Sequence, residues 1–232
     1  MILPGQHLVS THHEASKSTQ GWKVRLIILR PQIAVLLLAF IFFSSLTASG
    51  QRWPFEYWHD GKLVLETGDT LKGKIKYDIN TDIIQLDQKG TLQSFTGRKI
   101  IFYEIYDATS GRYRQFYSIP FSPSGGYKSP TFFELLAEGK ITLLVREALE
   151  YKNYTTGYYG YGSVSRLVLV NKYFIMDDKG RVEAFTGTKK DLMELMNKRE
   201  DEVKKFIKVN KLNLDHKYDQ ARVFEYYNSL FK

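Results

Sequence analysis

Histidine most often carries acid–base and metal chemistry near neutral pH, and the sequence has only two histidines beyond residue 50. His59 stands beside Asp60 among aromatic residues, whereas His216 stands at the start of an expected helix. Two histidines far apart in the chain exclude a metal site built on several imidazoles, and only one of them could serve a Ser–His–Asp triad. His59 is the better candidate, because the position of His216 is typical of surface or helix-capping residues.

Paired carboxylates are the other groups in this sequence that could do acid–base work. Glu134 with Glu138, and Glu147 with Glu150, could supply the acid and the base of a glycoside hydrolase, or they are ordinary surface acids. The sequence contains no GxSxG, HExxH or phosphate-binding loop motif. It contains no cysteine, which excludes disulfides, thiolate metal sites and cysteine nucleophiles. We therefore predict no catalytic residue, no metal site and no cofactor.

Residues 152–162 are rich in tyrosine and glycine, a composition typical of recognition loops. Tyrosine offers a large flat surface and a hydroxyl group at low entropic cost, and flat aromatic faces suit sugar rings. The alternative is a loop that folds back over one end of a sheet. Two tryptophans just beyond residue 50 have a similar pair of interpretations, an exposed patch or an arm pinned to the core. The candidate ligand-binding residues are Tyr154, Tyr158, Tyr159, Tyr161, Trp53 and Trp58.

The first 50 residues have the order of segments that is typical of a secretory signal peptide. A polar leader is followed by basic residues, an apolar run and small residues, namely Lys23, Arg25 and Arg30, then Ile33 to Phe43, then Ala48 and Gly50. The apolar run is shorter than the ~20 residues that a spanning helix needs, which favours cleavage before Gln51 over an uncleaved membrane anchor. We predict export to the periplasm or the outer envelope, with membrane contact only through this segment before cleavage.

Charge and composition favour a strand-rich domain and do not indicate nucleic-acid binding. The formal charge is +8, from 33 basic and 25 acidic residues, and residues 1–50 hold four of the basic residues and one of the acidic residues. Residues 51–232 therefore keep 29 basic and 24 acidic residues, a charge of +5, which is only mildly basic. Aromatic residues make up 15% of the chain, and aromatic residues are enriched in β-strands.

Two stretches ninety residues apart share a pattern: Asp87 to Lys99 reads DQKGTLQSFTGRK, and Asp177 to Lys189 reads DDKGRVEAFTGTK. An apolar strand precedes each stretch. Asp followed three positions later by Gly indicates a hairpin with a type I turn, in which Gly90 or Gly180 takes the left-handed position of a G1 bulge. The similarity is either an internal duplication or the convergence of two good hairpin turns. In both cases the stretches are framework elements.

Alternating and apolar runs predict β-strands through most of residues 51–187. Three lysines at alternate positions from 72 to 76 share one face of an expected strand. Such a row is typical of a solvated sheet face or a protected edge, with a polyanion site as the alternative. Ser129 followed by Pro130 favours a helix start. Phe132 to Glu138 is therefore expected to be a short helix, although a strand also fits these residues.

Residues 188–232 have helical periodicity instead. Thr188 and Asp191 resemble a capping box, apolar residues recur at helical spacing in three segments, and Asp215 is expected to cap the third. We predict an α+β fold: an antiparallel, strongly bent sheet or partly open β-barrel of about eight to ten strands, with a helical C-terminal region packed on it. The expected division is 1–50 as leader and signal peptide, 51–187 as β-rich domain and 188–232 as helical region, the last two in one compact unit.

Four segments between residues 61 and 232 form a combined pattern. They are a Gly-Asp-Thr-Leu-Lys-Gly-Lys-Ile strand at Gly68–Ile75, an Ala-Glu-Gly-Lys-Ile-Thr-Leu segment at Ala137–Leu143, a late Tyr-Phe strand, and a charged helical tail that ends with Tyr227-Asn228. The combination resembles a loose group of exported Gram-negative bacterial proteins of unknown function. The resemblance implies an exported envelope protein, and the group offers no catalytic residues to carry over.

These observations favour an exported, non-catalytic protein that binds a glycan or an envelope protein, or that serves as a structural component of the envelope. The alternative is a carboxylate-dependent hydrolase that acts on an envelope polymer. A deep cleft with two facing carboxylates would favour the hydrolase, whereas a shallow aromatic patch would favour binding.

Cleavage of the signal segment can be measured directly. Mass spectrometry of the mature protein should find an N-terminus between about residues 47 and 52, because the small residues that favour cleavage lie there. A full-length chain held in the inner membrane would show instead that the segment is an uncleaved anchor.

Overall fold

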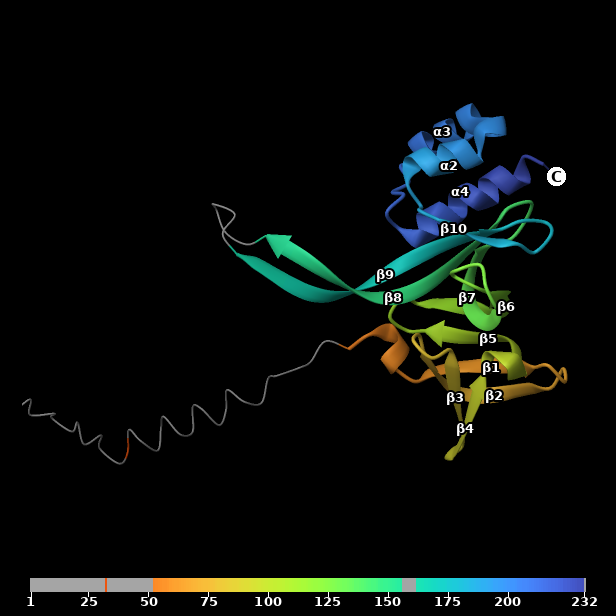
Figure 1. The fold of residues 1–232 in the computed structure, drawn as a ribbon, viewed down its shortest axis with the longest axis vertical. Coiled ribbons are helices and arrows are strands. Elements are labelled where there is room, and N and C mark those ends of the chain that lie inside the picture. The colour runs from red at the N-terminus through yellow and green to blue at the C-terminus, as the bar shows by residue number, and fades with distance from the viewer. Residues whose placement is uncertain (1–31, 33–51, 156–161, 232) are drawn as a thin grey trace, which may run out of the picture. The chain divides into compact units, whose positions relative to one another are not determined.

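A computed structural model of the chain describes residue 32, residues 52–155 and residues 162–231. By its internal contacts the chain divides into two units, residues 1–50 and residues 51–232. The described residues of the second unit form ten strands in one antiparallel sheet and, near the C-terminal end, three α-helices (Figure 1). The predicted combination of a β-rich region followed by a helical region is therefore confirmed.

Within residues 52–155 and 162–231 the strands come first along the chain and the α-helices last. The strands are β1 (His59–Leu65), β2 (Thr70–Asp78), β3 (Ile83–Gln88), β4 (Thr91–Thr96), β5 (Ile100–Asp107), β6 (Arg112–Phe121), β7 (Ser129–Ala137), β8 (Thr142–Thr155), β9 (Ser163–Met176) and β10 (Val182–Phe185). The helices are α2 (Lys189–Leu195), α3 (Glu200–Val209) and α4 (Lys217–Ser229), and the short 3-10 turns are η2 (Pro54–Glu56), η3 (Gly97–Lys99) and η4 (Asn197–Arg199). The spatial order of the strands is β10-β9-β8-β7-β6-β5-β1-β2-β3-β4.

The sheet is open, because within the described residues β10 at one end and β4 at the other pair with a single strand each. The two repeated stretches of the sequence form the hairpins at these two edges, β3–β4 and β9–β10. Each edge strand is followed by a helical element, η3 in one case and α2 in the other. The two repeated stretches therefore have the same role, since each one contributes an edge strand of the open sheet.

The turns of the two edge hairpins differ, although both glycines have the predicted left-handed conformation. Gly90 has φ 90° and Gly180 has φ 72°. In the first hairpin Lys89 is also left-handed, with φ 55°, so the paired strands enclose a two-residue turn of type I′ and not the expected type I turn with a bulge. In the second hairpin residues 177–181 form a longer loop. There the amide of Gly180 donates to the carbonyl of Asp177 at 3.0 Å, as expected for a type I turn.

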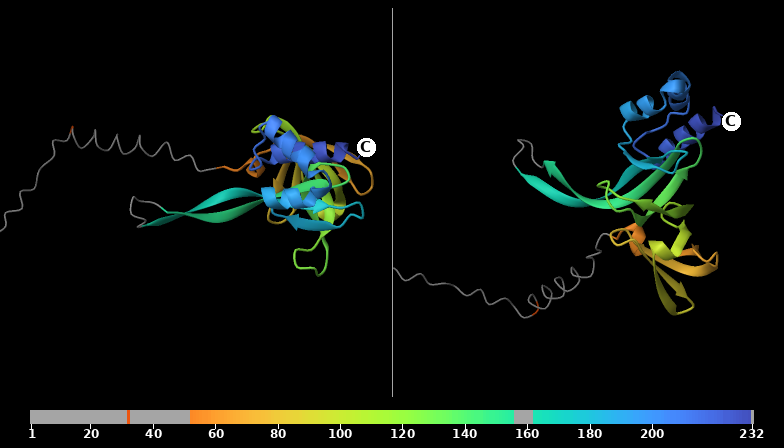
Figure 2. Two further views of the ribbon diagram at one scale, coloured as in Figure 1. Left: turned by 90° about the horizontal axis from the view of Figure 1, so that it is seen from above. Right: turned by 45° about the vertical axis from the view of Figure 1, so that its right-hand side comes forward.

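The core lies on both faces of the sheet, because alternate residues along a strand point to opposite faces. The inner face carries two hydrophobic clusters, one over β1, β2, β3, β5, β6 and the first half of β7, and one between β7–β10 and the helices. A third cluster lies on the outer face. Figures 1 and 2 show the helices stacked over the β10 end of the sheet. Representative members of the three clusters are Leu63, Ile75 and Tyr103, then Leu143, Leu192 and Phe224, then Phe133, Leu144 and Phe174.

The predicted short helix over Phe132 to Glu138 is wrong, because residues 132–137 belong to β7. Phe132 is buried in the first inner cluster and Phe133 in the outer cluster, so a central strand here needs apolar residues on both faces. A short apolar run of this kind has no periodicity that separates a strand from a helix. Pairing with β6 and β8 decides the matter, and Pro130 lies opposite Pro120 in the β6–β7 ladder.

The lysine row of β2 lies in the interior of the sheet and not at an edge, since β2 pairs with both β1 and β3. Lys74 forms an ion pair with Asp60 at 2.8 Å, and both side chains are more than half exposed. The row is therefore a solvated sheet face, which is one of the two common interpretations of its sequence pattern.

The start of α2 is close to the prediction, and the start of α4 differs from it. The side chain of Thr188 accepts a hydrogen bond from the amide of Asp191 at 3.3 Å. The Asp191 carboxylate accepts from the hydroxyl of Thr186 and not from the Thr188 amide, so only half of the capping box is formed. The N-cap residue of α4 is His216 and not Asp215, because the carbonyl of His216 accepts the first hydrogen bonds of the helix, from the amides of Asp219 and Gln220.

Replacing Gly90 or Gly180 with Val should lower the free energy of unfolding by about 1–2 kcal/mol, because a branched side chain is strained in the left-handed region. A Cβ at either position would meet no atom within 4 Å, so the loss would come from the backbone alone. Urea unfolding measures it. Gly126→Val is the control, because that position is equally open and has no positive φ. An equal loss in the control would assign the effect to the valine and not to the turn.

Candidate functional site

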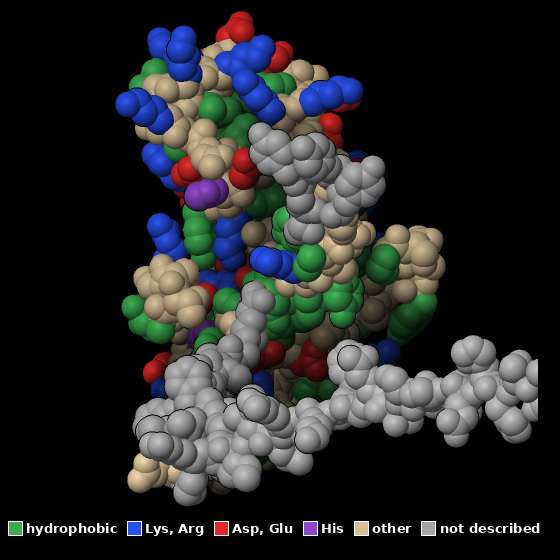
Figure 3. Space-filling view, turned by 90° about the vertical axis from the view of Figure 1, so that its left-hand side faces the viewer, with side chains coloured by type: hydrophobic (Ala, Val, Ile, Leu, Met, Phe, Trp, Pro, Cys, Tyr) green, Lys and Arg blue, Asp and Glu red, His purple; other side chains and the backbone are tan. Residues whose placement is uncertain are grey.

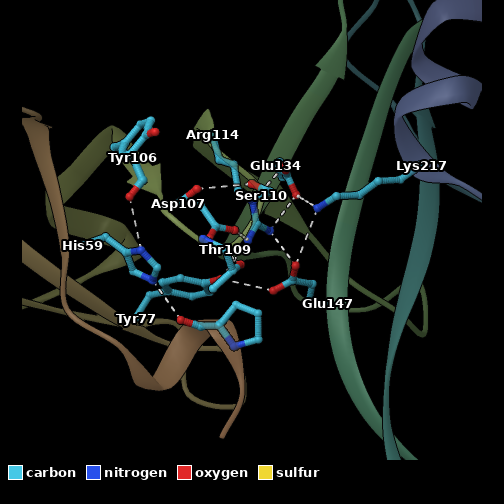
Figure 4. Close-up of polar contacts among 11 residues, drawn as sticks. His59, Tyr77, Tyr106, Asp107, Thr109, Ser110, Arg114, Glu134, Glu147 and Lys217 are labelled. Atoms are coloured by element: carbon cyan, nitrogen blue, oxygen red, sulfur yellow. Dashed lines mark hydrogen bonds and ion pairs between the residues drawn. The ribbon is translucent and has the colours of Figure 1, made fainter.

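A group of buried polar side chains lies on the inner face of the sheet and is named the Arg114 network (Figure 4). Each member comes from a different element, and most of them are nearly inaccessible to solvent. The members are Tyr77 of β2, Asp107 of β5, Arg114 of β6, Glu134 of β7, Glu147 of β8 and Lys217 of α4.

Arg114 is the centre of the network and uses each nitrogen of its guanidinium group. Its Nε donates to Oε1 of Glu134 at 2.9 Å and its Nη2 donates to Oε2 at 2.8 Å, which is the bidentate geometry that arginine forms best. Nη2 also donates to Oε1 of Glu147 at 2.6 Å. Nη1 donates to Oδ2 of Asp107 at 3.2 Å and to the hydroxyl of Tyr77 at 3.3 Å.

Lys217 brings a second positive charge to the same carboxylates. Its Nζ lies 2.9 Å from Oε2 of Glu134 and 3.6 Å from Oε1 of Glu147. The other oxygen of Glu147 accepts from the hydroxyl of Tyr77 at 3.1 Å. Burial raises the pKa of the Tyr77 phenol well above its usual value, so the hydroxyl keeps its proton and remains a donor.

Burial and charge pairing act in opposite directions on the ionised groups. Burial raises the pKa of the Glu134 carboxyl, but the charges and hydrogen bonds of Arg114 and Lys217 outweigh it and the pKa is lowered. For Asp107, burial is likewise outweighed by hydrogen bonds from Thr109 and by Arg114, and its pKa is lowered. Burial lowers the pKa of the Arg114 guanidinium, but the charge of Glu134 outweighs it and the pKa is raised. These groups therefore stay ionised near neutral pH.

The register of three strands brings the network together. Glu134 lies opposite Phe116 of β6 and opposite Val145 of β8. Arg114 is two residues from Phe116, and Glu147 is two residues from Val145, so all three charged side chains point to the inner face. The ring of Phe116 belongs to the first inner cluster, and its centroid lies 5.0 Å from the guanidinium carbon of Arg114.

Sequence reasoning missed Arg114, Asp107 and Lys217, and it paired the glutamates wrongly. Glu138 is exposed, and Glu150 forms a half-exposed ion pair with Lys172 on the neighbouring strand. The structure instead joins one glutamate from each expected pair, Glu134 and Glu147, through Arg114. A usable signal was the single glutamate inside the apolar run Phe132-Phe133-Glu134-Leu135-Leu136, because a lone charge in such a run needs a buried partner.

The geometry of the network suits a structural cross-link better than a hydrolytic site. A glycosidase needs one carboxylic acid that is protonated at neutral pH, whereas the pKa of Glu134 is lowered and both of its oxygens accept hydrogen bonds. A groove of about 510 Å³ between β6, β7 and α4 reaches Arg114 and Glu134. A second cavity beside Glu147 has a volume of about 30 Å³, which is room for about one or two water molecules.

The three aromatic candidates near the start of the described region have different positions. His59 is 4% exposed, its Nε2 lies 2.8 Å from the carbonyl oxygen of Pro54, and its Nδ1 lies 3.3 Å from the carbonyl oxygen of Tyr106. It therefore ties η2 to β5. Trp53 is half-buried against the first inner cluster, whereas Trp58 is 43% exposed. The structure does not bring Trp53 and Trp58 into one exposed patch.

The predicted recognition loop is carried by a two-stranded arm. β8 and β9 are 14 residues long and pair along their whole length, but β7 pairs with β8 only as far as Val145. Residues 150–155 and 163–168, beyond the part of β8 that contacts Arg114 and Asp82, are named the arm, which extends away from the rest of the sheet in Figures 1 and 2. Figure 3 faces the arm end-on and shows Lys and Arg side chains gathered over the helices.

Two tyrosines of the arm are open to solvent. Tyr154, a predicted site residue, is 45% exposed, and Tyr151, which the sequence analysis did not single out, is 75% exposed. Tyr158, Tyr159 and Tyr161 lie outside the described residues. Alternation along a strand places Tyr151 and Tyr154 on opposite faces of the arm, so both faces present an aromatic side chain.

Within residues 52–155 and 162–231, no group of three or more His, Asp or Glu side chains could hold a metal ion. No helix of the same residues is long and apolar enough to cross a membrane. The predicted signal segment, Ile33 to Phe43, lies outside the described residues.

Comparison with known proteins adds no assignment. The chain matches no protein-family model, and no curated protein and no solved structure is significantly similar to it.

Replacing Arg114 with Met should lower the free energy of unfolding by about 3–5 kcal/mol, because it leaves buried carboxylates without their main partner. Urea unfolding at neutral pH measures the change. Lys62→Met is the matched control, since Lys62 pairs with Glu104 at 3.1 Å but its side chain is 38% exposed, and such pairs contribute less than about 1 kcal/mol. Equal losses in the two variants would contradict the central role of Arg114.

Proposed function

We propose that this chain is an exported, non-catalytic protein of the cell envelope that binds a glycan or an envelope protein, or holds such a component in place. Export is inferred from the order of basic, apolar and small residues before Gln51. The observation that carries the binding role is the arm, with its exposed tyrosines and the tyrosine-rich loop that it carries. The proposed location is the periplasm or the outer envelope.

The Arg114 network supports the non-catalytic part of this proposal. Glu134 and Glu147 are the facing carboxylates that a hydrolase would require, but Arg114 and Lys217 hold both of them. Glu134 is a poor general acid, because the contacts with Arg114 and Lys217 that lower its pKa oppose its protonation. The geometry therefore gives the hydrolase alternative no support.

The open edges of the arm support binding. β10 pairs with β9 only from Tyr173 to Met176, and β7 stops at Val145. Within the described residues, both long edges of the arm are therefore free of a neighbouring strand. A free edge can accept a strand from a partner, and exposed tyrosines on both faces add area for recognition.

We also infer that the sheet is strongly bent. β2 and β8 are separated by four strands in the sheet order, which would put them roughly 24 Å apart in a flat sheet. The hydroxyl of Tyr77 on β2 nevertheless lies 3.1 Å from a carboxylate oxygen of Glu147 on β8. Asp82, between β2 and β3, lies 3.0 Å from Arg146 of β8. Both contacts support a sheet that curves toward its inner face and around the Arg114 network.

Replacing Tyr151 and Tyr154 together with Ala should weaken capture of envelope components by the purified protein and leave its melting temperature nearly unchanged, because both side chains are exposed. Capture from an envelope extract, compared by quantitative mass spectrometry, and a thermal melt measure the two effects. Leu92→Ala with Val209→Ala is the control, since both residues are exposed apolar side chains away from the arm.

Three results would count against the proposal. Equal capture by the tyrosine variant and the wild type would remove the arm as the binding element. A drop of the melting temperature by more than about 10 °C, where ~1 kcal/mol moves a domain of this size by about 2–4 °C, would show that the tyrosines are structural. Recovery of the unprocessed chain from the cytoplasm would contradict export.

A further inference from the structure

One side of β8 has no neighbouring strand where β8 runs out into the arm. Within the described residues β7 pairs with β8 only as far as Val145, and the two residues after Val145 contact the body of the protein through ion pairs. From residue 148 onward, β9 is the only strand of the described sheet that pairs with β8. Residues 148–155 are named the β8 edge. Backbone groups on the open side of such an edge can pair with a further strand.

The β8 edge carries a positive charge that the arm does not neutralise. Lys152 lies opposite Arg166 of β9 in the ladder, and both residues are exposed. None of the ion pairs found among the described residues involves either of them. Like charges directly opposite each other destabilise a pair of strands. A carboxylate placed beside Lys152 would therefore stabilise the arm.

A second copy of the same edge can supply that carboxylate. Antiparallel pairing joins residues whose backbone groups both point to the shared side, so two identical edges pair about a two-fold axis that passes through a residue. Glu150 and Lys152 are the only charged residues of the β8 edge. An axis through Tyr151 places Glu150 of each copy opposite Lys152 of the other. An axis through residue 150 or residue 152 would instead place like charges opposite each other.

We propose that this protein forms a two-fold symmetric dimer by antiparallel pairing of two β8 edges, with the axis at Tyr151. The arms of the two copies then form one four-stranded sheet in the order β9-β8-β8-β9. The two Glu150–Lys152 pairs and the repulsion in the adjacent registers select this register. Tyr151, which is 75% exposed, lies beside the Tyr151 side chain of the second copy. The β8 edge thus has the self-complementarity that a symmetric interface requires.

The other edge of the arm lacks this self-complementarity. Residues 163–170 of β9 carry Arg166 as their only charged residue, so no symmetric pairing of two β9 edges brings opposite charges together. The dimer therefore leaves the β9 edge open to the proposed envelope ligand and does not depend on what that ligand is. Two linked copies would bind a repetitive envelope component with higher avidity, without any new contact to it.

Exchange of the two charges tests the dimer by sedimentation velocity of the purified protein over a concentration series. Glu150→Lys places lysine opposite lysine, and Lys152→Glu places glutamate opposite glutamate, so each variant should dimerise about tenfold more weakly. The double variant should dimerise as the wild type does. An equal mixture of the two single variants should also form dimers, because every pair between the unlike copies then joins opposite charges.

Lys172→Met is the matched control for the charge exchange. Lys172 lies 2.7 Å from Glu150 within one copy, so its loss removes the internal partner of Glu150 and leaves the pairs between copies intact. This variant should dimerise at least as well as the wild type. A loss as large as that of Glu150→Lys would assign the effect to the arm itself and would contradict the proposed pairing.

A single introduced cysteine locates the axis, because the chain has no cysteine of its own. Tyr151→Cys should form an intermolecular disulfide on mild oxidation, since residues directly opposite each other have Cα atoms about 4.5–5.5 Å apart, a separation that a disulfide can span. Asn153→Cys is the control. It lies on the same face, but its two copies would be four residues apart along the strands, or roughly 13 Å, and should not cross-link.

Four results would overturn the inference. The first is a chain that stays monomeric up to about 1 mM. The second is a dimer that neither single charge variant weakens, and the third is a mixture of the two variants that does not dimerise. The fourth is cross-linking through residue 153 as fast as through residue 151. Assemblies larger than a dimer would also contradict it, because head-to-tail pairing of β8 with β9 of the next copy does not close.

Discussion

Arg114 is a charge that the fold can bury only by surrounding it with partners, and much of the structure is arranged to supply them. An isolated ion in a protein interior costs many kcal/mol, and the attraction of a counter-ion offsets this only when the geometry is good and every donor is used. Here four strands and one helix each contribute one side chain to the same guanidinium or its carboxylates. Removing any one element would leave a buried charge with an unmet partner.

The Arg114 network also explains how two hydrophobic clusters on one face of a sheet are joined. The first cluster involves β1, β2, β3, β5, β6 and β7, and the second involves the helices and β7–β10. Tyr77 reaches the network from the first region, and Lys217 reaches it from α4. Because hydrogen bonds and ion pairs depend on direction and apolar contacts do not, the network fixes the relative placement of two regions that hydrophobic contact alone would join less specifically.

The arm and the Arg114 network differ in burial and in the number of bonds that hold them, and therefore in expected local stability. Residues in the network are buried and bonded on several sides, whereas the arm beyond Leu149 and Leu169 has no third strand and an increasingly exposed surface. Segments with few buried contacts open at low cost, and recognition elements are often drawn from them. The same chain thus combines a densely bonded body with a projecting ribbon that has few buried contacts.

The sequence by itself determined the local features of this protein. It placed left-handed glycines at residues 90 and 180, the cap of α2 at Thr188, and a β-rich region followed by helices. Each of these depends on residues within a few positions of one another. The repeated stretches also predicted two hairpins of similar sequence that serve as framework elements, and both lie at edges of the sheet.

The tertiary structure alone decided which residues meet. Tyr77 and Glu147 are 70 positions apart, and Lys217 and Glu134 are 83 positions apart, so no local pattern could pair them. The choice of strand over helix for residues 132–137 and the projection of the arm beyond Val145 depend on which strands lie alongside. The physical reason is that burial and charge pairing are properties of the assembled sheet, whereas periodicity and turn chemistry are properties of short segments.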